Sequence, residues 1–389
     1  MQCVHARFGP RRFAIFLLAA TLTVPVHTQS GDPAGPASSL RADSSAFLVR
    51  RQAYVMGTRA TLAIAGGTHR DTALASLEQM LRVLETAERE LSTWRSDSLL
   101  SRLNTHPVGA PLSMSDELCS VLLELDHWRD QTGGAFDPAV GALVSAWALR
   151  DGGRLPTPAS LELARARSGL SFLHVTMDPC TVTRRADVTV DAGGFGKGLA
   201  LDRLLTLRPR YGSTSGPGRW MVDLGGQVAV SPVTERSELN SHGSTRSAGW
   251  PVAVAHPVHR DQSVLELRLD SGSLAVSGGS ERDRQVDRTR VGHILDPRRG
   301  VPANRSFSVA VWHPRALVAD VLSTALYVMG VEEGLAWAEA HAVAVCYLIP
   351  ATDSLTGSAT GSPVASQIKA TEVTLEASSI FRTRFGTAF

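Results

Sequence analysis

Leucine and other apolar residues recur at helical spacing in the first half of the chain. After the glycine pair at 66–67, steps of three and four residues predict an amphipathic helix whose apolar face carries Leu74, Leu77, Leu81, Leu84 and Leu91. A second helix is predicted over 116–131, stopped by Gly133 and Gly134, because glycine favours the conformation that ends a helix. A third helix should follow Pro138.

Strand patterns lie between these helices and dominate the second half of the chain. Residues 53–65 predict one strand that contains a glycine, and residues 172–190 alternate as in a hairpin that ends at 188–190. Further helices are predicted from Pro314 to about Met329 and over 335–342, and the remaining strand candidates are 220–224, 252–255, 264–269, 308–312 and 343–349. Since helices and strands mix without strict alternation, we expect an α+β (mixed α/β) fold.

Residues 1–30 have the pattern of a secretory signal peptide. Three basic residues (Arg7, Arg11 and Arg12) precede an apolar run over 13–24, which is too short to span roughly 30 Å of hydrocarbon. An N-terminal anchor helix is the alternative interpretation. Residues 31–50 are expected to form a flexible linker, which leaves 51–389 as a single domain with no stable transmembrane segment after signal cleavage. We therefore expect an exported protein, in the periplasm or at the outer face of the inner membrane.

Composition and charge narrow the class of partner. The 389-residue chain carries 39 Lys and Arg against 37 Asp and Glu, and 6% of its residues are aromatic. Because neither a basic excess nor a rich set of stacking residues is present, we expect no nucleic-acid partner. Once Cys3 leaves with the signal, an odd number of widely spaced cysteines remains. We therefore expect no disulfide framework and predict small buried apolar residues at Cys119, Cys180 and Cys346.

A glycine-rich segment at 191–198, with the sequence DAGGFGKG, precedes a predicted helix. Its glycines let the backbone approach a ligand closely, and Lys197 adds a positive charge suited to phosphate. The spacing matches neither a P-loop nor a GxGxxG motif. Phosphate binding and a structural turn are therefore both open interpretations.

Two pairs of polar residues are also candidates. Asp320 and Thr324 are four residues apart and would share one face of a helix. Their oxygens suit Mg²⁺ if phosphates and water complete the shell, although Thr324 could instead bond its own helix backbone. His293 and Asp296 flank a turn, where a histidine beside a carboxylate can act as a general base or can simply hydrogen-bond the turn.

Eight short segments, taken in order, resemble the motifs of the ApbE family of flavin transferases. They span roughly 54–350 and comprise 56–58 (MGT), 91–98 (LSTWRSDS), 133–138 (GGAFDP), 191–198 (DAGGFGKG), 223–226 (DLGG), 276–278 (VSG), 293–300 (HILDPRRG) and 319–330 (ADVLSTALYVMG). Each motif is weak alone, but their common order identifies the chain as a member of this family.

The resemblance implies an ApbE-like flavin transferase fold of two closely packed α/β subdomains, with the active site between them. It also implies an FAD:protein FMN transferase that binds FAD and Mg²⁺ and cleaves the FAD pyrophosphate. Such an enzyme transfers FMN to a Thr or Ser hydroxyl of an extracytoplasmic acceptor protein with a DxxTGAT-like motif, and releases AMP. Two alternatives are an FAD pyrophosphatase that gives FMN and AMP, and a non-catalytic periplasmic flavin-binding protein.

Site residues follow from the resemblance by matched position. Asp320, Thr324 and the carbonyl of Gly194 would hold the metal ion, and His293 would be the catalytic base on the acceptor hydroxyl. Ser323 stands where many members have a second carboxylate. Residues 353–360 loosely resemble the acceptor motif, but we interpret them as a polar loop and expect no flavin on Thr356. FAD would be contacted by Met56, Trp94, Ala135, Phe136, Asp137, Asp191, Lys197 and the backbone near Leu295.

Overall fold

Antiparallel strands build the main sheet of this protein. The structure, a computed structural model, describes residues 48–66, 69–207, 218–232, 249–279, 283–351 and 372–386. Within that part the main sheet has eight strands in the order β1-β2-β6-β7-β10-β15-β16-β17. Their bounds are Leu48–Val55 (β1), Thr58–Ala65 (β2), Arg219–Leu224 (β6), Gln227–Val230 (β7), Gly272–Gly278 (β10), Ser308–His313 (β15), Ala344–Pro350 (β16) and Val373–Ala377 (β17).

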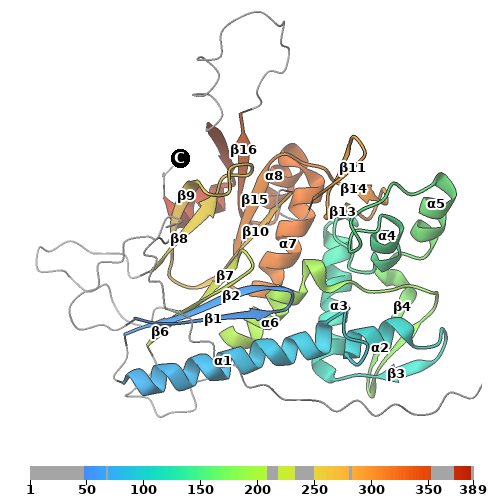
Figure 1. The fold of residues 1–389 in the computed structure, drawn as a ribbon, viewed down its shortest axis with the longest axis horizontal. Coiled ribbons are helices and arrows are strands. Elements are labelled where there is room, and N and C mark those ends of the chain that lie inside the picture. Colours follow the sequence, from blue (N-terminus) through green and yellow to red (C-terminus); the bar gives the residue numbers. More distant parts are fainter. Residues whose placement is uncertain are drawn as a thin grey trace, which may run out of the picture. The chain divides into compact units, whose positions relative to one another are not determined.

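Helices from distant parts of the chain pack against this sheet (Figure 1). α1 (Arg70–Leu91) and α6 (Gly196–Leu205) share a buried apolar cluster with β1, β2 and β6. α7 (Ala316–Met329) packs against β10 and β15, and Thr324 is the one residue of this fully described helix that is not buried. Such a helix is apolar on nearly every face because protein surrounds it. α8 (Val331–Ala340) follows it, and α9 (Ser379–Phe385) packs on β16.

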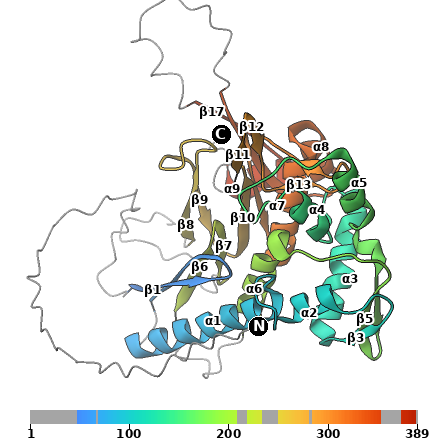
Figure 2. The same ribbon diagram turned by 45° about the vertical axis from the view of Figure 1, so that its right-hand side comes forward.

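Residues 99–191 form a smaller α/β unit, here called the small lobe (Figure 2). It contains α2 (Leu99–Thr105), β3 (Pro111–Ser113), α3 (Asp116–Gln131), α4 (Gly141–Ala146), α5 (Pro158–Ala166), η1 (Leu170–Phe172), β4 (Leu173–Met177) and β5 (Cys180–Arg184). Its strands have the order β3-β5-β4. Leu122 and Val182 of the small lobe belong to the same buried cluster as Val321 of α7, so the lobe and the main sheet share a core. The expected mixed α+β class is confirmed.

Short elements complete the described part of the chain. η2 (Ala192–Gly194) precedes α6, and three antiparallel pairs lie outside the two larger sheets. These pairs are β8 (Trp250–Ala255) with β9 (Ser263–Leu269), β11 (Arg284–Val286) with β12 (Thr289–Val291), and β13 (Leu295–Asp296) with β14 (Val301–Pro302).

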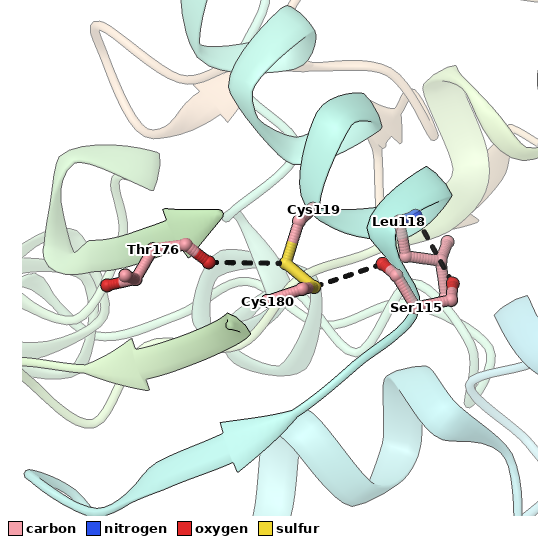
Figure 3. The surroundings of a disulfide bond; sticks show 5 residues. All are labelled: Ser115, Leu118, Cys119, Thr176 and Cys180. Atoms are coloured by element: carbon pink, nitrogen blue, oxygen red, sulfur yellow. Dashed lines mark hydrogen bonds between the residues drawn. A yellow bond between two sulfur atoms is a disulfide. The ribbon is translucent and has the colours of Figure 1, made fainter. Parts of the chain in front are cut away.

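A disulfide bond joins Cys119 and Cys180, which corrects the expectation of unpaired cysteines. Cys119 lies near the start of α3 and Cys180 begins β5, so the bond ties helix to sheet within the small lobe (Figure 3). The two residues are 61 apart in sequence, and the fold brings their Cα atoms to 6.2 Å. Their wide spacing along the chain gave no indication of this approach. Cys346 is free and buried, as predicted.

A tight turn at Met56 corrects the prediction of a single strand over 53–65. Met56 and Gly57 have φ angles of 54° and 70°, and β1 and β2 pair on either side of them. Positive φ at both central residues is typical of a type I′ hairpin turn. The expected linker over 31–50 also ends earlier, because β1 begins at Leu48.

The other element predictions are mostly confirmed. α1 and α3 follow the predicted bounds, although Leu74 is 42% exposed and lies off the buried face. The predicted hairpin is present as β4 and β5, but residues 188–190 are not part of a strand. Pro314 precedes α7 rather than lying in its first turn.

The predicted signal peptide, most of the linker and the segment around Thr356 lie outside the described residues. Within the described ranges, none of the helices combines the length and the apolar character that a membrane span requires.

Candidate active site

Asp320 holds the start of α6 against α7. One oxygen of its buried carboxylate, Oδ2, accepts a hydrogen bond from the backbone N–H of Gly198 at 2.9 Å, and the other, Oδ1, forms an ion pair with Lys197 Nζ at 2.9 Å. A Cβ atom at position 198 would lie 2.5 Å from the carbonyl oxygen of Ala316 and 2.7 Å from Leu317 Cα. Glycine at 198 is therefore what allows the two helices to approach closely enough for this contact.

Thr324, about one turn further along α7, also lies against the glycine-rich segment. A Cβ built on Gly194 would lie 3.3 Å from Thr324 Oγ1 and 3.3 Å from Phe136 Cε2, so this backbone lies beside the hydroxyl. Thr324 Oγ1 donates to the carbonyl oxygen of Asp320 at 3.1 Å. This is the helix-backbone bond named as an alternative, yet it uses only the hydroxyl hydrogen and leaves lone pairs for a cation. The structure thus brings Gly194, Asp320 and Thr324 close together, at a place here called the Asp320 corner.

Asp191 and Trp94 are linked through an arginine that sequence reasoning missed. Asp191 Oδ1 accepts the backbone N–H of Gly193 at 2.7 Å and caps η2, while Oδ2 forms an ion pair with Arg150. The Arg150 guanidinium lies 5.1 Å from the centroid of the Trp94 ring, within range of a cation–π interaction. Trp94 is 72% exposed and offers a flat apolar surface.

Asp137 stabilises the turn that follows α3. Its carboxylate accepts backbone N–H bonds from Ala139 at 2.8 Å and from Leu170 at 3.0 and 3.1 Å. Burial raises the pKa of Asp137, and the bonds from Leu170 and Ala139 oppose that shift. Ala135 and Phe136 beside it are buried, and the Phe136 ring lies beside the Gly194 backbone.

Met56 and Leu295 complete the set of expected flavin contacts. The backbone N–H of Met56 donates to Glu88 Oε1 at 2.9 Å, and its Cε lies 3.6 Å from a Cβ built on Gly196. The hairpin turn thus lies against the glycine-rich segment. Leu295 is buried in β13, two residues after His293.

His293 has a carboxylate partner that differs from the expected one. Its Nδ1 lies 3.1 Å from Asp283 Oδ1, and its backbone N–H donates to the same oxygen at 3.2 Å. Asp296 instead accepts bonds from the amide and the guanidinium of Arg298. Pairing of β11 with β12 brings Asp283 back to His293, and the turn residues Asp287-Arg288 between these short strands were the signal that could have indicated it.

The end of β10 connects this histidine to the same helix as Asp320. Ser277 Oγ lies 2.9 Å from Ser323 Oγ on α7. Two residues further on, a Cβ at Gly279 would lie 2.9 Å from the Tyr327 hydroxyl and 2.8 Å from Asp283 Oδ2. Burial and the nearby Asp283 charge raise the pKa of Tyr327 to about 12. The carboxylate partner of His293 therefore lies near Tyr327, on the same helix that carries Asp320.

The Asp320 corner offers a divalent cation oxygen donors only, and too few of them to complete a coordination shell. The donors are the Asp320 carboxylate, the Thr324 hydroxyl and the Gly194 carbonyl, all of them oxygen, which is the ligand type that Mg²⁺ prefers. No group of three or more His, Cys, Asp or Glu able to hold a metal occurs among the described residues. A cation held here needs further ligands from a substrate or from water.

A family model and several curated relatives match this chain. The ApbE family model matches residues 56–348. The FAD:protein FMN transferase of Vibrio cholerae is 32% identical over 279 residues, covering 70% of this chain and 78% of the relative. The FAD:protein FMN transferase of Treponema pallidum is 31% identical over 276 residues, covering 67% and 73%.

Solved structures of ApbE proteins also match this chain. The flavin transferase ApbE from Vibrio cholerae matches with a TM-score of 0.66 at 28% identity, covering 87% of this chain and 99% of that chain. The ApbE protein of Thermotoga maritima matches with a TM-score of 0.68 at 25% identity, covering 77% and 94%. The motif order, the assembled corner and these matches lead to one conclusion: the chain belongs to the ApbE family.

Proposed function

We propose that this protein is an FAD:protein FMN transferase, which cleaves the pyrophosphate of FAD, transfers FMN to a Thr or Ser hydroxyl and releases AMP. The observation that carries the proposal is the corner where the Asp320 carboxylate, the Thr324 hydroxyl and the glycine-rich segment at 191–198 meet. The names of the relatives support it, because several of them are FAD:protein FMN transferases.

Mg²⁺ is the cation that the donors of this corner fit. Asp320, Thr324 and Gly194 would supply hard oxygen ligands, and phosphate oxygens of FAD would complete the shell. When bound, such a cation neutralises the charge that develops on the leaving phosphate. A single carboxylate in the shell is consistent with this, because the substrate itself brings negative charge.

Lys197 would orient the pyrophosphate. Its ammonium lies 2.9 Å from Asp320 Oδ1 and is held by that carboxylate. An ammonium has three donor hydrogens, so it can keep one bond to Asp320 and offer another to a phosphate oxygen. The exposed ring of Trp94 would offer a stacking surface to the flavin ring system.

His293 would take the proton of the acceptor hydroxyl on Nε2. As the proton leaves, the hydroxyl oxygen forms a bond to the phosphorus of the FMN portion, and the phosphorus–oxygen bond to AMP breaks. The AMP phosphate keeps the electron pair of the broken bond. A hydroxyl is a weak nucleophile, so this assistance is what a transferase requires of the residue.

Export and a protein acceptor complete the proposal. A disulfide such as Cys119–Cys180 persists in oxidising compartments and is rare in the cytosol, which supports a location outside the cytoplasm. The acceptor would be an extracytoplasmic protein that carries a DxxTGAT-like motif.

Incubation with FAD, Mg²⁺ and a protein that carries a DxxTGAT motif tests the function. We expect in-gel flavin fluorescence on the acceptor and release of AMP. Loss of both is expected for Asp320→Asn, whereas Asp287→Asn, which changes an exposed acid in the turn between β11 and β12, should retain them. AMP and FMN without labelled acceptor would instead assign an FAD pyrophosphatase. No product despite bound FAD would leave a flavin-binding protein.

A further inference from the structure

One carboxylate oxygen of Asp283 contacts both the backbone and the ring of His293. Asp283 Oδ1 accepts the backbone N–H of His293 at 3.2 Å and lies 3.1 Å from the ring nitrogen Nδ1 of the same residue. A bond to the backbone fixes the position of the chain, and a bond to the ring fixes the rotation of the imidazole. Together they orient the ring with Nε2 directed away from the carboxylate.

Arg290 occupies the other oxygen of this carboxylate. Its Nε donates to Asp283 Oδ2 at 2.7 Å, and its Nη2 lies 2.7 Å from the same atom. Burial alone would raise the pKa of Asp283, but the bonds from His293 and Arg290 outweigh burial and hold that pKa below its usual value. An ionised carboxylate has no hydrogen to donate, so Nδ1 must carry the proton that is shared between them.

The described residues around Asp283 enclose its side chain closely. The Asp283 side chain is 9% exposed, and the absence of a Cβ at Gly279 makes space for its Oδ2. The nearby Tyr327 hydroxyl donates to the carbonyl oxygen of Arg305 at 3.1 Å and not to Asp283. Within the described ranges, the donors that contact this carboxylate are therefore His293 and Arg290.

We propose that Asp283 is a positioning residue for His293, which fixes the imidazole as the tautomer protonated on Nδ1 and leaves Nε2 to accept the proton of the acceptor hydroxyl. When Nε2 takes that proton, the ring becomes an imidazolium whose Nδ1–H is already directed at a carboxylate. The hydroxyl oxygen forms its bond to phosphorus as AMP leaves with the electron pair of the broken bond. This inference rests on the proposed transferase function and adds a residue to it.

An alternative role for Asp283 is purely structural, in which its bonds to Arg290 and His293 only stabilise the β11–β12 hairpin. The two roles differ in what they change. A structural residue would affect folding and FAD binding together with turnover, whereas a positioning residue affects turnover while FAD still binds. The tautomer of His293 is a further difference, because a structural role places no demand on it.

Asp283→Asn, with Asp287→Asn as the matched control in the same hairpin, tests the proposal. The amide cannot serve both Arg290 and His293 as acceptor, because one of its two ends is a donor. We expect kcat for FMN transfer to fall on the order of 10²-fold, the scale of general-base assistance, with the dissociation constant of FAD unchanged. The control should match the wild type in both.

Nitrogen-15 NMR of histidine-labelled protein supplies a readout that is independent of activity. His293 is assigned by comparison with His293→Gln, at a pH about two units above the usual imidazole pKa. We expect the wild-type ring to be protonated on Nδ1, and Asp283→Asn to lose that single tautomer. A wild-type ring protonated on Nε2, or unchanged kcat in Asp283→Asn, would overturn the inference while the transferase function stands. A wild-type protein that labels no acceptor would overturn the function, and the NMR result would still decide the positioning.

Discussion

Removal of the Cys119–Cys180 disulfide should destabilise the small lobe. The loss of stability can be estimated from the length of chain that the bond closes into a loop. The double variant Cys119→Ala/Cys180→Ala replaces two buried residues by small apolar ones and leaves the packing nearly intact. The bond closes a loop of 61 residues, for which the chain-entropy model gives about 4 kcal/mol of stabilisation. The effect acts mainly through the unfolded chain, which the bond prevents from expanding.

Thermal unfolding under oxidising conditions measures this difference. A loss of about 4 kcal/mol corresponds to a midpoint lowered by roughly 5 °C in a chain of 389 residues, because the entropy of unfolding grows with chain length. Reductant should lower the wild-type midpoint to that of the double variant and leave the variant unchanged. Cys346→Ala, which alters a free buried cysteine and keeps the disulfide, is the matched control, and reductant should lower its midpoint by as much as that of the wild type.

Two results would refute this reasoning. Equal midpoints for the oxidised wild type and the double variant would mean that the loop closure contributes nothing. Peptide mapping without reduction that finds no cross-link between Cys119 and Cys180 would remove the bond itself.

Three further predictions follow from the site and the core. Gly198→Ala should cost about 1–3 kcal/mol through overpacking and should abolish transfer, because its Cβ would lie 2.5 Å from the Ala316 carbonyl oxygen; unchanged denaturant stability and activity would contradict the close helix approach. Trp94→Ala should weaken FAD binding by about 0.5–1.5 kcal/mol in a fluorescence titration while Trp94→Phe retains most of the affinity, and equal affinities would exclude stacking on this ring. Stability should fall as the pH rises above 10, because an unfolded tyrosine ionises near pH 10 while Tyr327 is held neutral up to about pH 12 in the folded state. Tyr327→Phe should reduce that fall in urea midpoints taken at increasing alkaline pH, and an identical decline in the variant would exclude Tyr327 as its source.

Local patterns predicted much of the fold because they are set by neighbouring residues. The spacing of Leu118 and Leu122 indicated α3, since a buried helix face repeats within one or two turns. The hairpin at Met56 was missed because a positive φ at a non-glycine residue leaves little trace in a hydrophobic pattern. Motif order predicted which residues would gather at the corner, and the fold brings Asp320, Thr324 and Gly194 together.

Contacts between distant residues were beyond the reach of these patterns. Asp296 is three residues from His293 and was the expected partner, but Arg298 occupies its carboxylate. Asp283 is ten residues away and reaches His293 through strand pairing. The role of Gly198 likewise depends on the approach of α6 to α7, which neither helix encodes alone.

The small lobe is one continuous stretch of chain, inserted between α1 and α6. It carries Phe136 and Asp137, whereas Asp320 and Thr324 belong to α7. The residues expected to contact the flavin ring and those expected to hold the metal therefore lie on different parts of the chain. The small lobe could change in evolution while α7 is conserved. Relatives that differ in the flavin they accept would then still bind the pyrophosphate in the same way. Chimaeras that swap residues 99–191 between family members offer a direct route to altered cofactor choice.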